Sequence, residues 1–89
     1  HESVLRALIQ AGMKSFDAAS LEEIRLVRRI SKKARIHFMH TVKSPEAIQK
    51  AYFDYGVRDF SLDTLDELNK ILEQTNFAED LNLYVRFAP

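Results

Sequence analysis

Residues 14–24, KSFDAASLEEI, decide the fold class of this chain, because here a strand runs directly into a capped helix. The alternation of apolar and polar residues over 14–18 predicts a short strand. Ser20-Leu21-Glu22-Glu23 then forms a capping box. The Ser20 hydroxyl is expected to accept a hydrogen bond from the amide of Glu23, and the Glu23 carboxylate one from the amide of Ser20.

The same strand–helix unit recurs along the chain. Further strands are predicted near 35–39, 57–62 and 81–88, and successive strands start about 21–24 residues apart. Ser44-Pro45 predicts the start of one intervening helix, and Asp63 is expected to cap the next. Gly12 and Gly56 are placed to end helices in the left-handed conformation. This rhythm predicts an α/β fold with about four parallel βα units.

Two architectures fit that rhythm. One is a partial (β/α)₈ TIM-type barrel, since a complete barrel needs about 250 residues and four strands supply only half of it. The other is a small open sheet of the flavodoxin type, which would need about five strands. The periodicity alone favours neither. The even spacing leaves no room for a linker, so residues 1–89 are expected to form one domain or part of one.

Composition excludes several classes of protein. The chain has 89 residues, of which 46% are hydrophobic and 29% charged, so it is not a disordered tail. It has no cysteine, which excludes disulfide scaffolds and thiolate sites. Thirteen basic and thirteen acidic residues give no net charge that would attract nucleic acid or a membrane surface. With no long apolar run and no signal peptide, we expect a cytoplasmic protein with no nucleic-acid or membrane partner.

Polar residues stand at the predicted strand ends, where parallel α/β folds bind their ligands. They are Asp17, His40, Ser61 with Asp63, and Arg86. Arg86 lies between Val85 and Phe87, within a strand that is expected to be covered on both faces. A buried guanidinium without a partner is unfavourable, so Arg86 needs an anionic or polar partner. That partner is either a carboxylate such as Asp17 or an oxygen of a ligand. Asp17 itself either binds the amides of the following helix or faces a ligand.

Other polar residues have simpler interpretations. His37 and His40 point to opposite faces of a strand, so no metal site is expected. Lys43 is interpreted as a solvated lysine, a partner of a neighbouring carboxylate or a phosphate ligand. The basic cluster of Arg25, Arg28, Arg29, Lys32, Lys33 and Arg35 is expected to be a solvated helix face. No signature of nucleophilic catalysis is present, and two glycines do not make a phosphate-binding loop.

Five segments, in order, carry a resemblance to a known family. They are Val4–Leu8, Phe16–Ile24 (a Phe-Asp-x-Ala-Ser pattern with Glu23 three residues after Ser20), Phe38–Lys43, Gly56–Leu68 and Leu83–Ala88. Together they resemble the pyridoxal-phosphate-dependent decarboxylases of ornithine, diaminopimelate, lysine, arginine and carboxynorspermidine, which have an alanine-racemase-like barrel. Thr41 departs from the pattern, because that position is usually proline.

The resemblance implies a section of a barrel that binds pyridoxal phosphate and acts on a basic amino acid in polyamine or amino-acid metabolism. It implies that Asp17 and Arg86 lie beside the cofactor, with Glu23 and His40 supporting them. The lysine that binds the cofactor would lie before His1, so no catalytic residue and no metal ligand is expected in residues 1–89. The complete protein would be a homodimer, and the isolated chain would be inactive and would self-associate. An alternative is a catalytically silent, antizyme-inhibitor-like homologue that acts as a regulatory binding protein.

Overall fold

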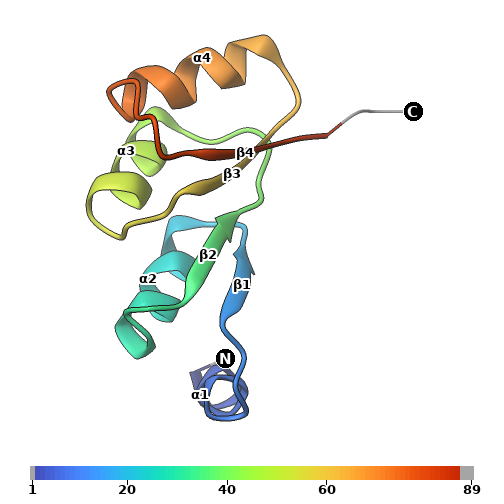
Figure 1. The fold of residues 1–89 in the computed structure, drawn as a ribbon, viewed down its shortest axis with the longest axis vertical. Coiled ribbons are helices and arrows are strands. Elements are labelled where there is room, and N and C mark those ends of the chain that lie inside the picture. The colour runs from blue at the N-terminus through green and yellow to red at the C-terminus, as the bar shows by residue number, and fades with distance from the viewer. Residues whose placement is uncertain (1, 87–89) are drawn as a thin grey trace.

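Helices and strands alternate along residues 2–86, the part of the chain that the computed structural model describes (Figure 1). In chain order the elements are α1 (Glu2–Gln10), β1 (Ser15–Ala18), α2 (Leu21–Ile30), β2 (Arg35–Phe38), α3 (Pro45–Phe53), β3 (Asp59–Leu62), α4 (Leu65–Gln74) and β4 (Asn82–Val85). The four expected βα units are therefore present. Within this part of the chain, no helix is long and apolar enough to cross a membrane.

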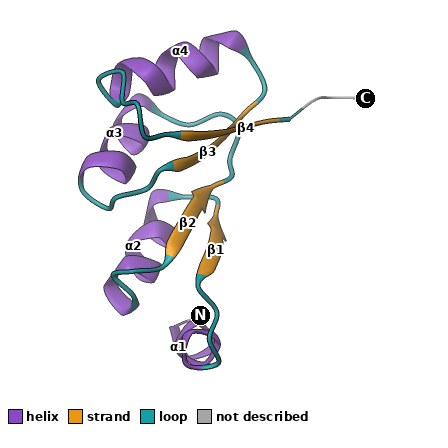
Figure 2. Ribbon diagram, in the orientation of Figure 1, coloured by secondary structure: helices purple, strands orange, loops and turns teal. Residues whose placement is uncertain are grey.

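The four strands form one parallel sheet in the order β1-β2-β3-β4. Helices α2, α3 and α4 all lie along one side of it (Figure 2). A flavodoxin-like sheet would have the strand order 2-1-3-4-5 and helices on both faces. Sequential strand order with the crossover helices on one side is the geometry of a (β/α)₈ barrel, so the structure decides between the two architectures in favour of a partial barrel.

The hydrophobic core lies between the sheet and these helices. Alternate strand residues point toward the helices, and Phe38 and Phe60, which are paired in the register of β2 and β3, are almost completely buried. The other core residues are Leu5, Ala18, Ile24, Val27, Ala34, Ile36, Ile48, Ala51, Val57, Leu62 and Ile71. Because every second strand residue is used here, the opposite, helix-free face is built from the remaining ones.

Most predicted helix ends are observed. Ser20 Oγ accepts from the amide of Glu23 at 3.2 Å, and Ser44 Oγ accepts from the amide of Ala47 at 3.1 Å ahead of Pro45. Gly12 and Gly56 have φ of 99° and 69°, the left-handed conformation that a residue with a side chain rarely adopts.

Three local expectations were wrong in detail. The cap of α4 is Thr64, whose extended backbone lets its hydroxyl accept from the amide of Glu67 at 3.0 Å, and not Asp63. The Glu23 carboxylate accepts from the amide of Ala19 and not from that of Ser20. Within the described residues the last strand is no longer than the others: β4 has four residues, and β3, its partner in the described sheet, also has four. Residues 87 and 88 of the predicted strand lie outside the described residues.

Candidate functional site

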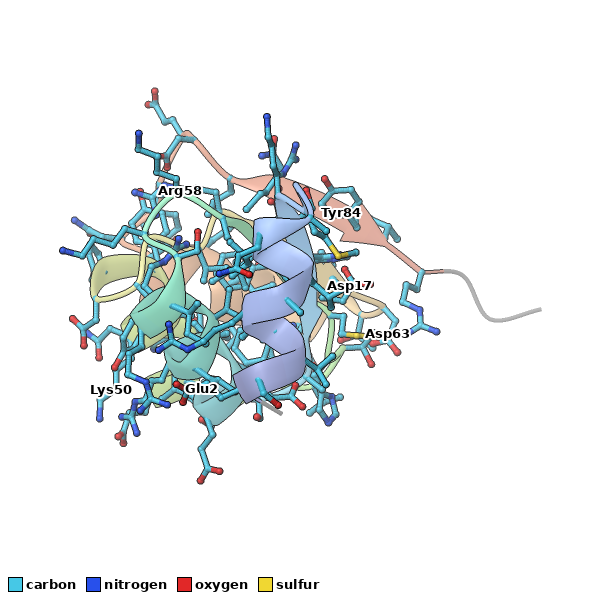
Figure 3. The ribbon with its side chains drawn as sticks, turned by 90° about the horizontal axis from the view of Figure 1, so that it is seen from below. Glu2, Asp17, Lys50, Arg58, Asp63 and Tyr84 are labelled. Atoms are coloured by element: carbon cyan, nitrogen blue, oxygen red, sulfur yellow. The ribbon has the colours of Figure 1, made fainter. Side chains whose placement is uncertain are left out.

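The helix-free face of the sheet is polar, although strands this central to a fold usually carry apolar residues on both faces. Its side chains come from every strand. They are Ser15 and Asp17 from β1, Arg35 and His37 from β2, Asp59 and Ser61 from β3, and Asn82 and Tyr84 from β4. All but Ser61 and Asn82 line a hollow of about 220 Å³ with Phe16. Asp17 and Tyr84 lie on one side of the molecule, away from Lys50 and Arg58 (Figure 3).

An ion pair anchors one end of this face. Arg35 on β2 binds the carboxylate of Asp59 on β3 with two hydrogen bonds, of 2.6 and 2.9 Å, and donates a third, of 3.0 Å, to the hydroxyl of Tyr84. Asp59 is only 2% exposed. The hydrogen bonds from Arg35 lower the pKa of Asp59, and Asp59 raises the pKa of Arg35. The pair therefore keeps both charges and joins β2, β3 and β4.

His37 occupies the centre of the face. Its Nε2 lies 2.7 Å from the hydroxyl of Ser61, and its Nδ1 lies 3.4 Å from a carboxylate oxygen of Asp17. Its ring lies 4.6 Å from that of Tyr84. Sequence patterns do not predict this contact set, because its members come from four different strands and only the sheet register brings them together.

A second polar cluster fixes the loop that follows β2. The ammonium of Lys43, which has no exposed surface, donates to the carbonyls of His40 and Ser61 at 2.6 Å each and pairs with Glu67 on α4 at 3.0 Å. The backbone amide of Lys43 also donates to Glu67, at 3.2 Å. Lys70 closes the cluster by pairing with the second oxygen of Glu67 at 2.8 Å.

Burial disfavours the charged forms of both Lys43 and Glu67. Desolvation lowers the pKa of Lys43, and the hydrogen bond from Lys43 to Glu67 only partly opposes this. For Glu67, burial alone would raise the pKa, but the hydrogen bonds from Lys70 and Lys43 outweigh burial and hold that pKa below its ordinary value. Of the three interpretations of Lys43, the partner of a neighbouring carboxylate is the one observed. The sequence carried only a weak signal for Glu67, namely that it and Lys43 both belong to the family motifs.

The predicted site residues fall at different places along the sheet. Asp17 and Arg86 belong to its opposite edges, so they do not form the ion pair considered above. Asp17 contacts His37 instead, and Arg86, directly after β4, is exposed and donates its amide to the carbonyl of Leu62 at 2.9 Å. Both residues thus remain accessible to a ligand.

Glu23 and His40 shape the loops at the carboxyl ends of β1 and β2. Glu23 accepts from the amide of Ala19 at 2.6 Å, which holds the turn between β1 and α2. His40 Nδ1 accepts from the amide of Val42 at 3.4 Å. His40 also lines a shallow hollow of about 190 Å³ with Ala19, Ser20, Lys43 and neighbouring residues. His37 and His40 therefore face different surroundings, and within residues 2–86 no group of three potential metal ligands occurs.

The basic cluster was expected to be a solvated helix face, but two of its arginines are not simply solvated. Arg28 is partly buried and donates to the carbonyls of Tyr55, Lys32 and Ala34 at 2.8–2.9 Å. Arg35 belongs to the sheet and pairs with Asp59. These two arginines are structural because they satisfy carbonyls and a carboxylate that folding removes from water.

Comparisons with known proteins agree with this architecture. The family model for the pyridoxal-binding domain of the pyridoxal-dependent decarboxylases matches residues 1–89. No curated protein matches the chain.

Solved structures of three decarboxylases are similar to the chain. The arginine decarboxylase of Paramecium bursaria Chlorella virus is 30% identical over 94% of this chain, with a TM-score of 0.79. The lysine/ornithine decarboxylase of Vibrio vulnificus, in complex with putrescine, is 31% identical over 96% of the chain, with a TM-score of 0.79. The ornithine decarboxylase of Entamoeba histolytica is 25% identical over 98% of the chain, with a TM-score of 0.82.

The chain spans between 22% and 26% of the length of these three structures. The family model nevertheless covers it from end to end, and the described sheet has the strand order of a barrel. The chain therefore belongs to the family of the pyridoxal-dependent decarboxylases, within their pyridoxal-binding domain.

Proposed function

We propose that residues 1–89 are an internal part of the pyridoxal-phosphate-binding barrel of a decarboxylase that acts on a basic amino acid such as ornithine, lysine, arginine or diaminopimelate. One observation carries the proposal. The two positions that match cofactor-side residues of the family, Asp17 and Arg86, lie in or directly after strands of the barrel-type sheet, and both are exposed. The family model and the named neighbours support it.

The residues present fit one side of the cofactor. Asp17 supplies a carboxylate and Arg86 a guanidinium, which suit the polar substituents of a pyridine ring. The phosphate is a different matter, because a phosphate cradle needs glycines at the carboxyl ends of strands. Gly12 and Gly56 precede β1 and β3, and each ends a helix. We therefore assign ring contacts, and not phosphate contacts, to this part of the protein.

Each residue has a distinct role in the proposed reaction. Bound pyridoxal phosphate supplies an electron-withdrawing ring that takes up the electrons released when CO₂ leaves the substrate. Arg86 holds a positive charge beside this ring, and Asp17 orients it by accepting hydrogen bonds. Glu23 keeps the turn after β1 in place through the amide of Ala19, and the Lys43 ammonium does the same for the loop of His40.

The chain by itself is proposed to be inactive. In the family the cofactor is bound to a lysine, and we place that lysine on a strand before His1. Lys14 precedes β1, and Lys43 is buried against Glu67, so neither is positioned to replace it. Treatment of the isolated chain with pyridoxal phosphate and borohydride should give no adduct specific to one lysine. We also propose that the complete protein is a cytoplasmic homodimer of polyamine or amino-acid metabolism.

The test is a decarboxylation assay of the complete protein with pyridoxal phosphate and each of the four amino acids, measuring CO₂ release. We expect turnover of at least one. Arg86→Lys keeps the charge but loses the planar fork, so it should lower turnover more than it lowers the thermal midpoint. Wild-type turnover in this variant would remove Arg86 from the site. If added pyridoxal phosphate has no effect and none of the four amino acids releases CO₂, the result would favour the catalytically silent regulatory homologue.

A further inference from the structure

We propose that His37 is a positioning residue that holds the Asp17 carboxylate in its orientation toward the cofactor, and that Ser61 and Tyr84 hold His37 in turn. This inference rests on the proposed function, because it takes Asp17 as a contact of the cofactor ring. It goes beyond that function by giving a role to a histidine that no family motif quoted above includes.

The contacts of His37 leave its ring little freedom. Ser61 lies at 2.7 Å from Nε2, and the Tyr84 ring at 4.6 Å limits rotation of the imidazole. Ser61 belongs to the buried inner strand β3 and is 2% exposed, so it is a rigid support. Tyr84 is itself fixed, because its hydroxyl accepts from Arg35 at 3.0 Å and lies 3.4 Å from Asp59.

The partners of His37 favour one position for its ring hydrogen. The hydroxyl of Ser61 can donate to or accept from Nε2, whereas the carboxylate of Asp17 can only accept. Hydrogen bonds on both sides of the ring therefore require the hydrogen on Nδ1, with the Ser61 hydroxyl donating to Nε2. Nδ1 lies 3.4 Å from Oδ1 of Asp17, whose side chain is 66% exposed and can rotate to shorten this contact. An exposed carboxylate is free to adopt several rotamers, so a fixed donor beside it restricts the orientation that a ligand meets.

The arrangement of Ser61, His37 and Asp17 has the order of a nucleophilic triad, yet its burial argues against that chemistry. Ser61 is 2% exposed within a strand that pairs on both sides, so no acyl group can reach its hydroxyl. In a triad the serine stands at the surface of the site and the aspartate is buried. Here Ser61 is the buried member and Asp17 the exposed one, which is the order expected for support of Asp17.

The test compares two substitutions of His37 in the complete protein. The amide of His37→Asn occupies the place of Nδ1 and can still donate to Asp17. The amide of His37→Gln reaches the place of Nε2, so it can contact Ser61 but not Asp17. Both substitutions remove the ring that packs on Tyr84. Ser15→Ala is the matched control, because it changes an exposed side chain in the same hollow, two residues from Asp17.

The readouts are the dissociation constant of pyridoxal phosphate by equilibrium dialysis and the thermal midpoint of the cofactor-free protein. We expect His37→Gln to weaken cofactor binding roughly three- to tenfold, the effect of one lost hydrogen bond, and His37→Asn to weaken it by less than about threefold. Ser15→Ala should leave it unchanged. Asp17→Asn should weaken binding, and adding His37→Gln to that variant should have little further effect.

The outcomes separate this inference from the proposed function. If the wild type binds the cofactor and Asp17→Asn weakens binding, but both His37 variants bind like the wild type, the inference is overturned and the function stands. Equal weakening in His37→Asn and His37→Gln, with equally lowered thermal midpoints, shows a merely structural histidine and also overturns it. Unchanged binding in Asp17→Asn removes the premise about Asp17. A wild type that binds no cofactor overturns the proposed function itself.

Discussion

The side chain of Lys43 shows how a single residue couples distant parts of this chain. Its ammonium has three oxygen partners, which come from the loop after β2, from β3 and from α4. A buried ion pair contributes little net stability when intact, because desolvation offsets the attraction between the charges. Its loss is costly, since the buried carbonyls of His40 and Ser61 would lose this donor and Glu67 would keep only one of its two cationic partners, Lys70.

Replacing Lys43 tests how much the loss of its buried ammonium destabilises the fold. Lys43→Met should lower the free energy of unfolding by about 3–5 kcal/mol, the usual result of removing one member of a buried pair. Urea unfolding followed by circular dichroism measures it. Lys50→Met is the matched control, because Lys50 forms an exposed pair with Glu46 within α3, and its loss should cost less than about 0.5 kcal/mol. Equal effects for the two variants would contradict a structural role of the Lys43 pair.

Asp59 and Glu67 make stability depend on pH in the acidic range. Both have folded-state pKa values below their ordinary values of 3.8 and 4.5. A lowered folded pKa stabilises the folded state fully above the ordinary value, and this stabilisation is lost as the pH falls through the folded value. We expect the free energy of unfolding to be flat from pH 7 to about 5 and to fall below about pH 4.

The substitution Asp59→Asn isolates the share of Asp59 in this pH dependence. The variant should be less stable than the wild type at pH 7, because Arg35 loses its charged partner. It should also lose less stability between pH 5 and 3, because one of the two buried carboxyl groups with a lowered pKa is gone. Urea titrations at each pH give both quantities. An unchanged pH dependence would show that the pair with Arg35 does not affect the titration of Asp59.

At the scale of elements, the sequence predicted what local chemistry determines. The strands over 14–18 and 35–39, the Ser20 and Ser44 caps and the two glycine ends were all predicted, because each depends on residues within a few positions of one another. The Asp63 cap and the length of the last strand were predicted wrongly. A cap depends on the backbone of one residue, here Thr64, and strand length on the partner strand.

The candidate site was less predictable than the elements. Asp17, His40 and Arg86 could be named because they follow or end strands. The polar network of the helix-free face could not, because Arg35 meets Asp59 and His37 meets Ser61 across 24 residues, a separation that only the sheet register brings into contact. The placement of Asp17 and Arg86 beside a cofactor stays a prediction.

The N-terminus of α4 offers a direct test of the corrected cap. Thr64→Ala removes the hydroxyl that accepts from the amide of Glu67, so it should destabilise the protein by about 1 kcal/mol. Asp63→Ala should cost less than about 0.5 kcal/mol, because Asp63 is exposed and does not cap the helix. Thermal and urea unfolding compare the two. A larger cost for Asp63→Ala would restore Asp63 as the cap.

At the scale of the whole molecule, the described chain is a four-stranded sheet with one face covered by helices and the other face open. Helices α2, α3 and α4 cover one side of the sheet, and in the described chain no helix covers the opposite side (Figure 1). Asp17 and Tyr84 line the hollow on that open side. In a closed barrel that side is packed with side chains from the remaining strands. Here Tyr84 is 42% exposed on that side, and Val85, on the other face of the same strand, is 55% exposed. The outer edges of β1 and β4 have no neighbouring strand in the described chain.

We therefore expect the isolated 89-residue chain to self-associate. Unpaired strand edges and an open sheet face favour pairing with other copies, and a chain of this size buries only about 60–65% of its unfolded surface. Sedimentation velocity combined with circular dichroism checks this over a range of concentrations. A monomer that melts cooperatively and does not associate on concentration would show that the unit is independently stable, and the proposal of an internal barrel section would then fail.

The hydrogen bond from the Lys43 amide to Glu67 has a consequence for local opening motions. Amides in surface loops usually exchange with solvent quickly, because nothing in the loop protects them. This one is held by a carboxylate of a helix 24 residues away in the chain, so it can exchange only when α4 separates from the loop. Its deuterium uptake would therefore follow the undocking of a helix, and the loop that carries His40 would open and close together with the third βα unit as one cooperative segment.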